Sequence, residues 1–435
     1  MLAKRIHIKD ALGKAGKEVV VAGWIDHIKS LGKIIFITLR DKTGKLQVVA
    51  LKNKVDSDDF KALEKLTPES TIVIKGNIQE SKAKNASHEL ALKDFEILTK
   101  SDVPLPIDMG DETTTNIDKR IDNRVLDTRR ERVNAIFQIR SKLFKYSVDF
   151  FDKEGFVNIN TPKITSSGAE SGAELFALPY FDKTGYLAQS PQMYKQMFVM
   201  GGFERVYEIA PVFRAEKSHT TRHLTEFTGI DMEMGFIKDE HDVMDVVEEL
   251  FKFVLKKVKE ECKEELKLLS VDFKIPKKIP RIKHAEIRKL LEKEGKKISE
   301  DDDLDSEAEA LLGKIVKKKY GEDFVFALNY PYTIRPFYHM KPDDDPKGTR
   351  SFDIIWNGVE IATGAQREHR YDVFIAQTKE KGVDIQQEYA NIFRFGSIPH
   401  GGIGLGLDRM VHRLLNLDNV REAVLLPRDP ERLTP

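Results

Sequence analysis

Between residues 17 and 98, short runs of alternating apolar and polar side chains are separated by turn residues. A period of two is typical of β-strands that bury one face. The predicted strands cover residues 19–25, 34–40, 46–50, 71–76 and 95–98, and a helical pattern lies near residues 60–66. Five strands with one helical interlude favour a small β-barrel of the oligonucleotide-binding kind.

A different pattern follows this barrel. Residues 104–133 are polar and contain two prolines, which indicates a linker or hinge. From residue 134 to residue 435, helical and strand-like patterns alternate, and Lys- and Glu-rich amphipathic helices dominate residues 239–322. We therefore expect an α+β protein with a barrel over residues 1–103, a linker, and a larger domain over residues 134–435 that carries a helical insertion at roughly 239–322.

Composition narrows the class of protein. The 435 residues are 40% hydrophobic and 33% charged, with no apolar run long enough to span a membrane. No signal-peptide core follows the first residues, and Cys262 is the single cysteine, so we expect a cytoplasmic protein. Net charge is zero, yet the first 54 residues carry twelve basic and four acidic side chains. This excess indicates a barrel that meets a polyanion, although a lysine-rich soluble surface explains it equally well.

Three residues of the predicted barrel are candidates for nucleic-acid contact. Phe36 offers a stacking ring, Lys29 a phosphate contact, and Gln47 an amide that can read a base edge. A core position is the alternative for Phe36.

The stretch from Arg214 to Phe227 holds candidate nucleotide-binding groups. Arginines offer planar forks to phosphates, a carboxylate such as Glu216 can accept from an exocyclic amine, and an aromatic ring can stack on a base. Neither a phosphate-binding loop nor a dinucleotide fingerprint occurs in the chain. The alternative is a surface hairpin with solvated charges.

A β-hairpin with an Asn357-Gly358 turn is predicted over residues 351–361. In that register Asp353 and Glu360 project on the same side as near diagonal neighbours. Their like charges favour a cation between them, and hard oxygen ligands suit Mg²⁺. The alternative is two separately solvated carboxylates on a strand edge.

Three further segments carry candidate ligand contacts. Ser190 suits a helix N-cap, and Gln192 and Lys195 follow on one face near the positive end of that helix, which favours an anionic or carbonyl-bearing ligand. Arg367 follows a stretch of small residues. Arg409 lies in the first turn of a helix after a glycine-rich strand, where a cation opposes the helix dipole unless it faces phosphate or a base.

Taken together, these segments resemble the three signature motifs of class II aminoacyl-tRNA synthetases, and their order and spacing are similar to those of the aspartyl-tRNA synthetase family of the compact archaeal and eukaryotic type. The resemblance runs from Val21 to Pro435. It implies an anticodon-binding barrel, a catalytic domain built on an antiparallel sheet flanked by helices, and a homodimer whose interface includes residues 155–162.

The resemblance also assigns roles to residues. For ATP it implies Arg214 on the α-phosphate and the reacting carboxylate, Glu216 on the adenine amine, Arg222 and His223 toward the γ-phosphate, and Phe227 and Arg409 on the two faces of adenine. It implies Asp353 and Glu360 as Mg²⁺ ligands. For aspartate it implies Glu170, Gln192 and Asp231 around the α-amino group, Ser190 in the pocket wall, and Lys195 with Arg367 on the side-chain carboxylate. Anticodon contacts fall to Lys29, Phe36 and Gln47.

The implied reaction is activation of L-aspartate by ATP, followed by transfer of aspartate to tRNA-Asp. Three residues depart from the family pattern. Ser171 stands where the family usually has glycine after Glu170, which bears on the α-amino assignment. Asp26 and His27 lie where the barrel helps to read an anticodon base, so charging of tRNA-Asn as well stays open. The alternatives are an asparaginyl-tRNA synthetase, which Lys195 disfavours, an asparagine-forming paralogue, which the barrel disfavours, and a non-catalytic nucleic-acid-binding module.

Overall fold

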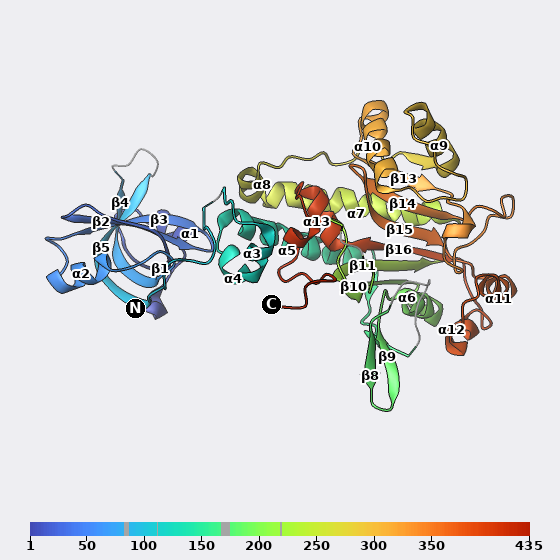
Figure 1. Ribbon diagram of the computed structural model, residues 1–435, viewed down its shortest axis with the longest axis horizontal. Helices are drawn as coiled ribbons and strands as arrows, with labels where there is room; N and C mark the ends of the chain where they lie inside the picture. The colour runs from blue at the N-terminus through green and yellow to red at the C-terminus, as the bar shows by residue number, and fades with distance from the viewer. Residues whose placement is uncertain (82–86, 111, 167–174, 218–219) are drawn as a thin grey trace. The chain divides into compact units, whose positions relative to one another are not determined.

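The computed structural model (Figure 1) describes residues 1–81, 87–110, 112–166, 175–217 and 220–435. It divides into two units, Met1–Asp108 and Met109–Pro435. Among the helices of these described ranges, none is both long and apolar enough to cross a membrane.

The first unit is a closed five-stranded barrel, which confirms the predicted fold. Its strands, in spatial order, are β1 (Glu18–Ser30), β2 (Ile34–Asp41), β3 (Gly44–Leu51), β5 (His88–Thr99) and β4 (Thr71–Glu80). Two helices accompany them, α1 (Ile8–Leu12) and α2 (Ser57–Glu64). Strand β5 begins earlier than the sequence pattern predicted, because it pairs with both β3 and β4 and buries Leu90 and Leu92 in closing the barrel.

The second unit is built on an eight-stranded sheet. In order its strands are β12 (Arg281–Lys283), β13 (Phe324–Leu328), β14 (Ser351–Trp356), β15 (Val359–Gln366), β16 (His400–Gly406), β11 (Glu226–Gly235), β10 (Arg205–Phe213) and β6 (Val157–Asn158). The middle strands are antiparallel as expected, whereas the outermost pair at each edge, β12 with β13 and β10 with β6, is parallel. A short second sheet contains β7 (Ile164–Thr165), β9 (Lys183–Leu187) and β8 (Ala177–Tyr180).

The large core of the main sheet includes side chains of helices α5 (Glu131–Lys153), α7 (Glu240–Glu261) and α13 (Leu407–Leu414). The insertion predicted over residues 239–322 begins with α7. This helix is not fully solvated, because it buries an apolar stripe from Val243 to Val258 in the core. Strand β12 of the insertion extends the main sheet. The other helices between residues 239 and 322 are α8 (Lys263–Leu269), α9 (His284–Lys293) and α10 (Ser306–Tyr320). Later helices are α11 (Tyr371–Glu380) and α12 (Gln387–Ile392).

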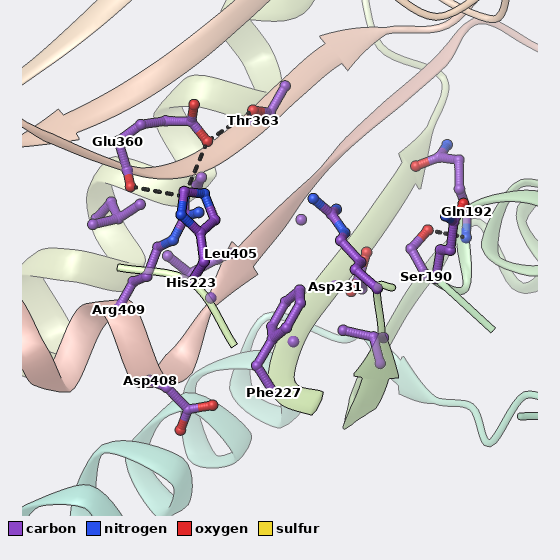
Figure 2. Close-up of a pocket in the computed structure, with 18 of the residues that line it drawn as sticks. Ser190, Gln192, His223, Phe227, Asp231, Glu360, Thr363, Leu405, Asp408 and Arg409 are labelled. Carbon is purple, nitrogen blue, oxygen red and sulfur yellow. Dashed lines mark hydrogen bonds and ion pairs between the residues drawn. The ribbon is translucent and has the colours of Figure 1, made fainter. Parts of the chain in front are cut away.

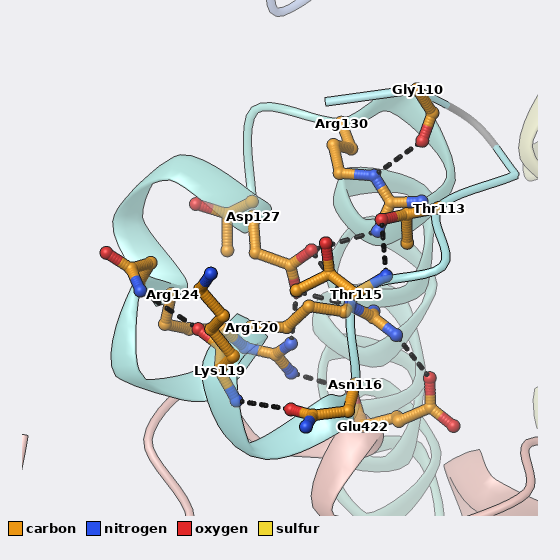
Figure 3. Close-up of polar contacts among 12 residues, drawn as sticks. Gly110, Thr113, Thr115, Asn116, Lys119, Arg120, Arg124, Asp127, Arg130 and Glu422 are labelled. Atoms are coloured by element: carbon orange, nitrogen blue, oxygen red, sulfur yellow. Dashed lines mark hydrogen bonds and ion pairs between the residues drawn. The ribbon is translucent and has the colours of Figure 1, made fainter. Parts of the chain in front are cut away.

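The segment predicted as a linker contains helices α3 (Ile117–Asp122) and α4 (Arg124–Asp127). Figure 3 shows how arginines gather around Asp127, which is fully buried. Its carboxylate accepts from Arg124 at 2.7 Å, from Arg130 at 3.0 Å and from Arg120 at 3.1 Å. Burial opposes its ionisation, but the arginines outweigh burial and lower the pKa of Asp127. Residues 120–130 are thus an ordered ionic cluster of the second unit.

Candidate active site

A cavity of about 260 Å³ opens at one side of the main sheet. Strands β10, β11, β15 and β16, helix α6 (Gln192–Phe198) and helix α13 contribute to its wall. The sequence-predicted residues that line it are Ser190, Gln192, Arg214, Glu216, Arg222, His223, Phe227, Asp231, Glu360, Arg367 and Arg409, several of which are labelled in Figure 2. Lys195 and Asp353 lie behind the wall, and Glu170 falls outside the described residues.

The loop between β10 and β11 supplies one end of the cavity. Arg214 begins this loop, where its backbone N–H donates to the carbonyl of Thr225. Its guanidinium lies 5.5 Å from the centre of the Phe227 ring and 3.9 Å from the Glu216 carboxylate. Arg214 is exposed, and Glu216 and Phe227 are half-buried, so a phosphate fork, an amine acceptor and a stacking ring share one accessible surface.

Arg409 faces this loop from helix α13, in the first turn as predicted. Its guanidinium donates to the backbone carbonyls of Glu360 at 3.2 Å and Arg222 at 3.4 Å. Arg222 in turn pairs with Glu309 of α10 at 2.8 Å. Burial and the charge of Arg409 lower the pKa of His223. The loop and α13 thus place cations beside an imidazole whose protonation they disfavour.

The predicted hairpin turn is confirmed, since Asn357 and Gly358 have φ of 47° and 75°. Ile355 pairs with Glu360 as expected, but a bulge follows, so Asp353 pairs with Thr363. Glu360 nevertheless lies close enough to Asp353 for the charge of Asp353 to affect its ionisation. Burial and the negative charge of Asp353 raise the pKa of Glu360 to about 7.

Asp353 is 2% exposed, and its Oδ2 accepts from Arg335 at 2.5 Å. Its Oδ1 is buried without a hydrogen-bond partner in the part of the chain that the structure describes. An unsatisfied carboxylate oxygen beside a second carboxylate fits a divalent cation with oxygen ligands. Among the described residues, no group of three or more His, Cys, Asp or Glu side chains is placed to hold a metal ion.

Helix α6 supplies the other end of the cavity. It begins at Gln192, one residue later than predicted, with Pro191 at the N-cap. The Ser190 hydroxyl still accepts from the Gln192 backbone N–H at 3.0 Å. The Gln192 side chain accepts from Arg367 at 3.1 Å and donates to Gln196 at 3.0 Å, so its amide orientation is fixed.

Four charged side chains form a buried group at this end: Lys195, Asp231, Glu233 and Arg367. The Lys195 ammonium lies 3.0 Å from Asp231 and 3.4 Å from Glu233. Arg367 lines the cavity and pairs with Glu233 at 2.9 Å. Burial alone would raise the pKa of Glu233, but Arg367 and Lys195 lower it. The positive charges of Lys195 and Arg367 are thus balanced by Asp231 and Glu233. The prediction from Lys195 and Arg367 did not include this pairing.

Among the side chains near the cavity that sequence reasoning missed are two glutamates, an arginine and a histidine. Glu233 follows Asp231 by two positions on β11, so strand alternation could have placed both on one face. Glu309, which also accepts from the Glu360 backbone at 3.0 Å, comes from a distant helix. Arg335 and His339 lie in an irregular segment with no periodic signal.

The three barrel candidates share one outer face. Lys29 pairs with Phe36 across β1 and β2, and Thr38 pairs with Gln47 across β2 and β3. Because residues two apart on a strand face the same way, these side chains lie together. Phe36 is half-buried and Lys29 exposed, while the Gln47 amide donates to Glu89 at 3.0 Å.

Two family models match the chain. Residues 116–430 match tRNA synthetases class II (D, K and N), and residues 19–98 match the OB-fold nucleic acid binding domain. Among curated proteins, the aspartate–tRNA(Asp) ligase of Pyrococcus abyssi is 44% identical over 97% of each chain. The aspartate–tRNA(Asp/Asn) ligase of Methanopyrus kandleri is 43% identical, over 97% of this chain and 96% of that protein.

Solved structures are similar over nearly the whole chain. The asparaginyl-tRNA synthetase of Pyrococcus horikoshii, complexed with asparaginyl-adenylate, has a TM-score of 0.93 at 32% identity and covers 99% of both chains. The aspartyl tRNA synthetase of Entamoeba histolytica has a TM-score of 0.91 at 32% identity, covering 99% of this chain and 93% of that one.

Proposed function

This chain belongs to the class II tRNA synthetases of the D, K and N group, and on that premise we propose that it ligates L-aspartate to tRNA. The supporting observation is a single cavity whose ends differ in chemistry. One end offers arginines, a carboxylate and a ring suited to ATP, and the other offers a buried arginine, Arg367, suited to a carboxylate.

In the first step the α-carboxylate of aspartate attacks the α-phosphorus of ATP, and pyrophosphate leaves. Arg214 holds the α-phosphate and the attacking carboxylate. Phe227 and Arg409 cover the two faces of adenine, while Glu216 accepts from its amine. Arg222 and His223 lie toward the γ-phosphate. The protein contributes position and charge rather than a covalent intermediate.

Asp353 and Glu360 would hold Mg²⁺. The ion would neutralise phosphate charge while ATP reacts. The support for this assignment is the unpartnered Asp353 oxygen beside the carboxylate of Glu360.

Aspartate fits the opposite end. Asp231 and Gln192 receive its α-amino group, and Ser190 borders the pocket. Glu170, outside the described residues, is a third candidate for the α-amino group. Arg367 binds the side-chain carboxylate. Lys195 supports the same carboxylate from behind the wall by balancing Asp231 and Glu233.

In the second step the terminal ribose of tRNA takes the aspartyl group. The barrel face with Lys29, Phe36 and Gln47 reads the anticodon. We propose tRNA-Asp as the substrate, and the Asp/Asn names of relatives such as the Methanopyrus kandleri protein favour tRNA-Asn as a second one.

We also propose a cytoplasmic homodimer. Strand β6 is the last strand of the main sheet, and Val157 on it is 41% exposed. Phe203, which precedes the neighbouring strand β10 in the sequence, is 47% exposed. An apolar sheet edge of this kind favours association with a second copy.

Amino-acid-dependent pyrophosphate exchange with ATP tests the activity. We expect exchange with aspartate and little with asparagine. Exchange with asparagine alone, or with neither amino acid, would contradict the proposal. Charging of tRNA-Asp and tRNA-Asn transcripts in parallel then decides the tRNA range.

A further inference from the structure

A chain of hydrogen bonds reaches Gln192 from behind the cavity wall. Gln196 follows Gln192 by one turn of α6, His400 is the first residue of β16, and both Gln196 and His400 are fully buried. The Gln192 amide nitrogen donates to the Gln196 side-chain oxygen at 3.0 Å. The Gln196 nitrogen lies 2.8 Å from Nε2 of His400, whose Nδ1 lies 2.9 Å from the carbonyl oxygen of Ile398. Gln196 and His400 are not among the described residues that line the cavity, so they can act on a ligand only through other residues.

The two ends of this chain fix the direction of every hydrogen bond in it. A carbonyl oxygen only accepts, so Nδ1 of His400 carries a proton and donates to Ile398. A guanidinium only donates, and Nη2 of Arg367 donates to the Gln192 side-chain oxygen at 3.1 Å. Between these ends, Nε2 of His400 accepts from the Gln196 nitrogen, and the Gln196 oxygen accepts from the Gln192 nitrogen. The orientation of the Gln192 amide therefore depends on Gln196 and His400.

The chain requires a neutral His400 ring, with one donor and one acceptor. Burial lowers the pKa of His400 to about 4. Among the nearby charges, Glu233 favours the protonated ring, whereas Arg367 and His369 oppose it. Burial outweighs Glu233, so the ring is neutral at neutral pH and its single proton lies on Nδ1.

The direction of the Gln192 amide decides what this side chain offers to an amino acid in the cavity. Its oxygen has two lone pairs, and Arg367 uses one of them. The α-ammonium group of a substrate only donates, so the second lone pair suits it. A reversed amide would turn its NH₂ toward both Arg367 and the ammonium, and buried donors would then face each other without an acceptor. Binding of the amino acid therefore needs the amide oxygen on the side of Arg367.

We propose that Gln196 and His400 are positioning residues for the amino-acid end of the cavity, because they hold the Gln192 amide with its oxygen toward Arg367 and the α-ammonium group of the substrate. The inference rests on the proposed function, in which Gln192 contacts the α-amino group. It adds two residues that do not touch the substrate and yet determine how well the amino acid binds.

Two substitutions of Gln196 in the full-length protein test this direction. Gln196→Met keeps the length of the side chain but removes the acceptor for Gln192 and the donor for His400. Gln196→Glu keeps the acceptor, and a proton shared with His400 keeps the other bond, either as a carboxylate with an imidazolium or as an acid with a neutral ring. We expect kcat/KM for aspartate in pyrophosphate exchange to fall about 10- to 100-fold in Gln196→Met and at most about threefold in Gln196→Glu. KM for ATP should stay within about twofold in both, because the nucleotide end is unchanged.

Tyr389→Phe is the matched control within the chain. The Tyr389 hydroxyl donates to the Gln196 oxygen at 2.7 Å. A hydroxyl can donate or accept, so it does not set the direction of the amide. We expect its loss to change kcat/KM for aspartate by less than about threefold.

A role in core packing alone makes the opposite prediction for Gln196, because methionine fits an apolar core better than a buried carboxylate does. A Gln196→Glu variant more damaged than Gln196→Met would overturn the proposal. Equal losses for aspartate and ATP, or a loss in Tyr389→Phe as large as that in Gln196→Met, would also overturn it. If the wild-type protein supports exchange with asparagine but not aspartate, the proposed function fails. The same variants measured with asparagine then test the positioning role, because both amino acids carry the α-ammonium group.

A measurement on the wild-type protein covers the case in which the variants do not fold. In protein labelled with ¹⁵N at histidine, the His400 ring at neutral pH should carry a proton on Nδ1 alone. A ring protonated on Nε2, alone or together with Nδ1, would overturn the proposal, because the Gln196 amide would then have to reverse. This result does not depend on which amino acid the protein activates, so it tests the inference separately from the proposed function.

Discussion

Lys195 is a buried side chain outside the cavity, and we propose that it influences which amino acid binds inside. Its ammonium donates to Asp231 at 3.0 Å and to the Ile403 carbonyl at 2.9 Å. In Lys195→Ala, Asp231 and Glu233 lose a buried counter-charge and repel the substrate carboxylate. We expect KM for aspartate to rise at least about tenfold, equivalent to about 1.4 kcal/mol, with a much smaller change for ATP.

Pyrophosphate exchange at varied aspartate and varied ATP measures both constants. Lys163→Ala is a matched control, because Lys163 pairs with Glu208 at 2.8 Å but does not line the cavity. Equal rises in both constants for Lys195→Ala would count against the role of Lys195 at the amino-acid end.

The ionised Glu360 carboxylate should lower the stability of the folded protein, although the proposed function needs it. Its pKa is about 7 in the folded protein, because of burial and Asp353, and about 4.3 in an unfolded chain. The folded state therefore holds this proton more tightly, and stability from the protonated form is lost as pH rises from about 4.3 through 7. Without divalent cations, we expect Glu360→Gln to be more stable than the wild type at pH 8, by about 1 to 2 kcal/mol after solvent screening of a partly exposed group.

Thermal unfolding at pH 5.5 and pH 8 tests this sign. The advantage of Glu360→Gln should shrink at pH 5.5, where the wild-type side chain is mostly protonated, and exchange activity should fall in the variant at both pH values. A constant difference between the two pH values would contradict the assigned titration.

At the scale of elements, turn residues and helical periodicity predicted those elements that depend on neighbouring residues in the sequence. The Asn357-Gly358 hairpin and the buried stripe of α13 follow from short sequence patterns alone. The burial of α7 was not predicted from its sequence. This helix is rich in Lys and Glu, and its apolar stripe packs against α5, which lies about a hundred residues earlier in the chain. Arg335 and His339 escaped for the same reason, since only tertiary contacts bring an irregular segment to the cavity.

The ionic cluster around Asp127 should stabilise the segment from α3 to α5. Arg124, one of its partners, also donates to the carbonyls of Val424 at 2.9 Å and Leu425 at 3.1 Å (Figure 3 shows the cluster itself). Asp127→Asn leaves buried arginines without their counter-charge, so we expect the free energy of unfolding of the second unit to fall by about 3 to 5 kcal/mol.

Chemical denaturation at two pH values measures the loss. Because the pKa of Asp127 is lowered in the folded protein, its carboxylate stabilises above about pH 4 and loses that effect as pH falls through the folded pKa. The difference between Asp127→Asn and the wild type should therefore narrow in acid. Asp122→Asn, at an exposed pair with Arg432, is the control and should cost under about 1 kcal/mol. Equal effects of the two substitutions would contradict a buried hub.

At the scale of the whole molecule, the cavity proposed for amino-acid activation and the face proposed for the anticodon lie in separate units. Among the described residues, those that line the cavity fall between Gln189 and Val420, within Met109–Pro435. The barrel has its own hydrophobic core and carries the proposed anticodon face. Amino-acid activation and tRNA recognition should therefore be separable by deletion, even though one chain performs both.

A chain of residues 109–435 is expected to keep aspartate-dependent pyrophosphate exchange within about threefold of the full-length protein while losing most of its kcat/KM for tRNA, because the activation site lies entirely within it. Full-length Phe36→Ala is the matched point variant. Loss of one stacking ring should lower kcat/KM for tRNA about 10- to 100-fold and leave exchange unchanged. Charging and exchange measured on the same preparations compare the two activities. Loss of exchange in a folded 109–435 chain would mean that the barrel contributes to activation, and normal charging by Phe36→Ala would remove this face from tRNA recognition.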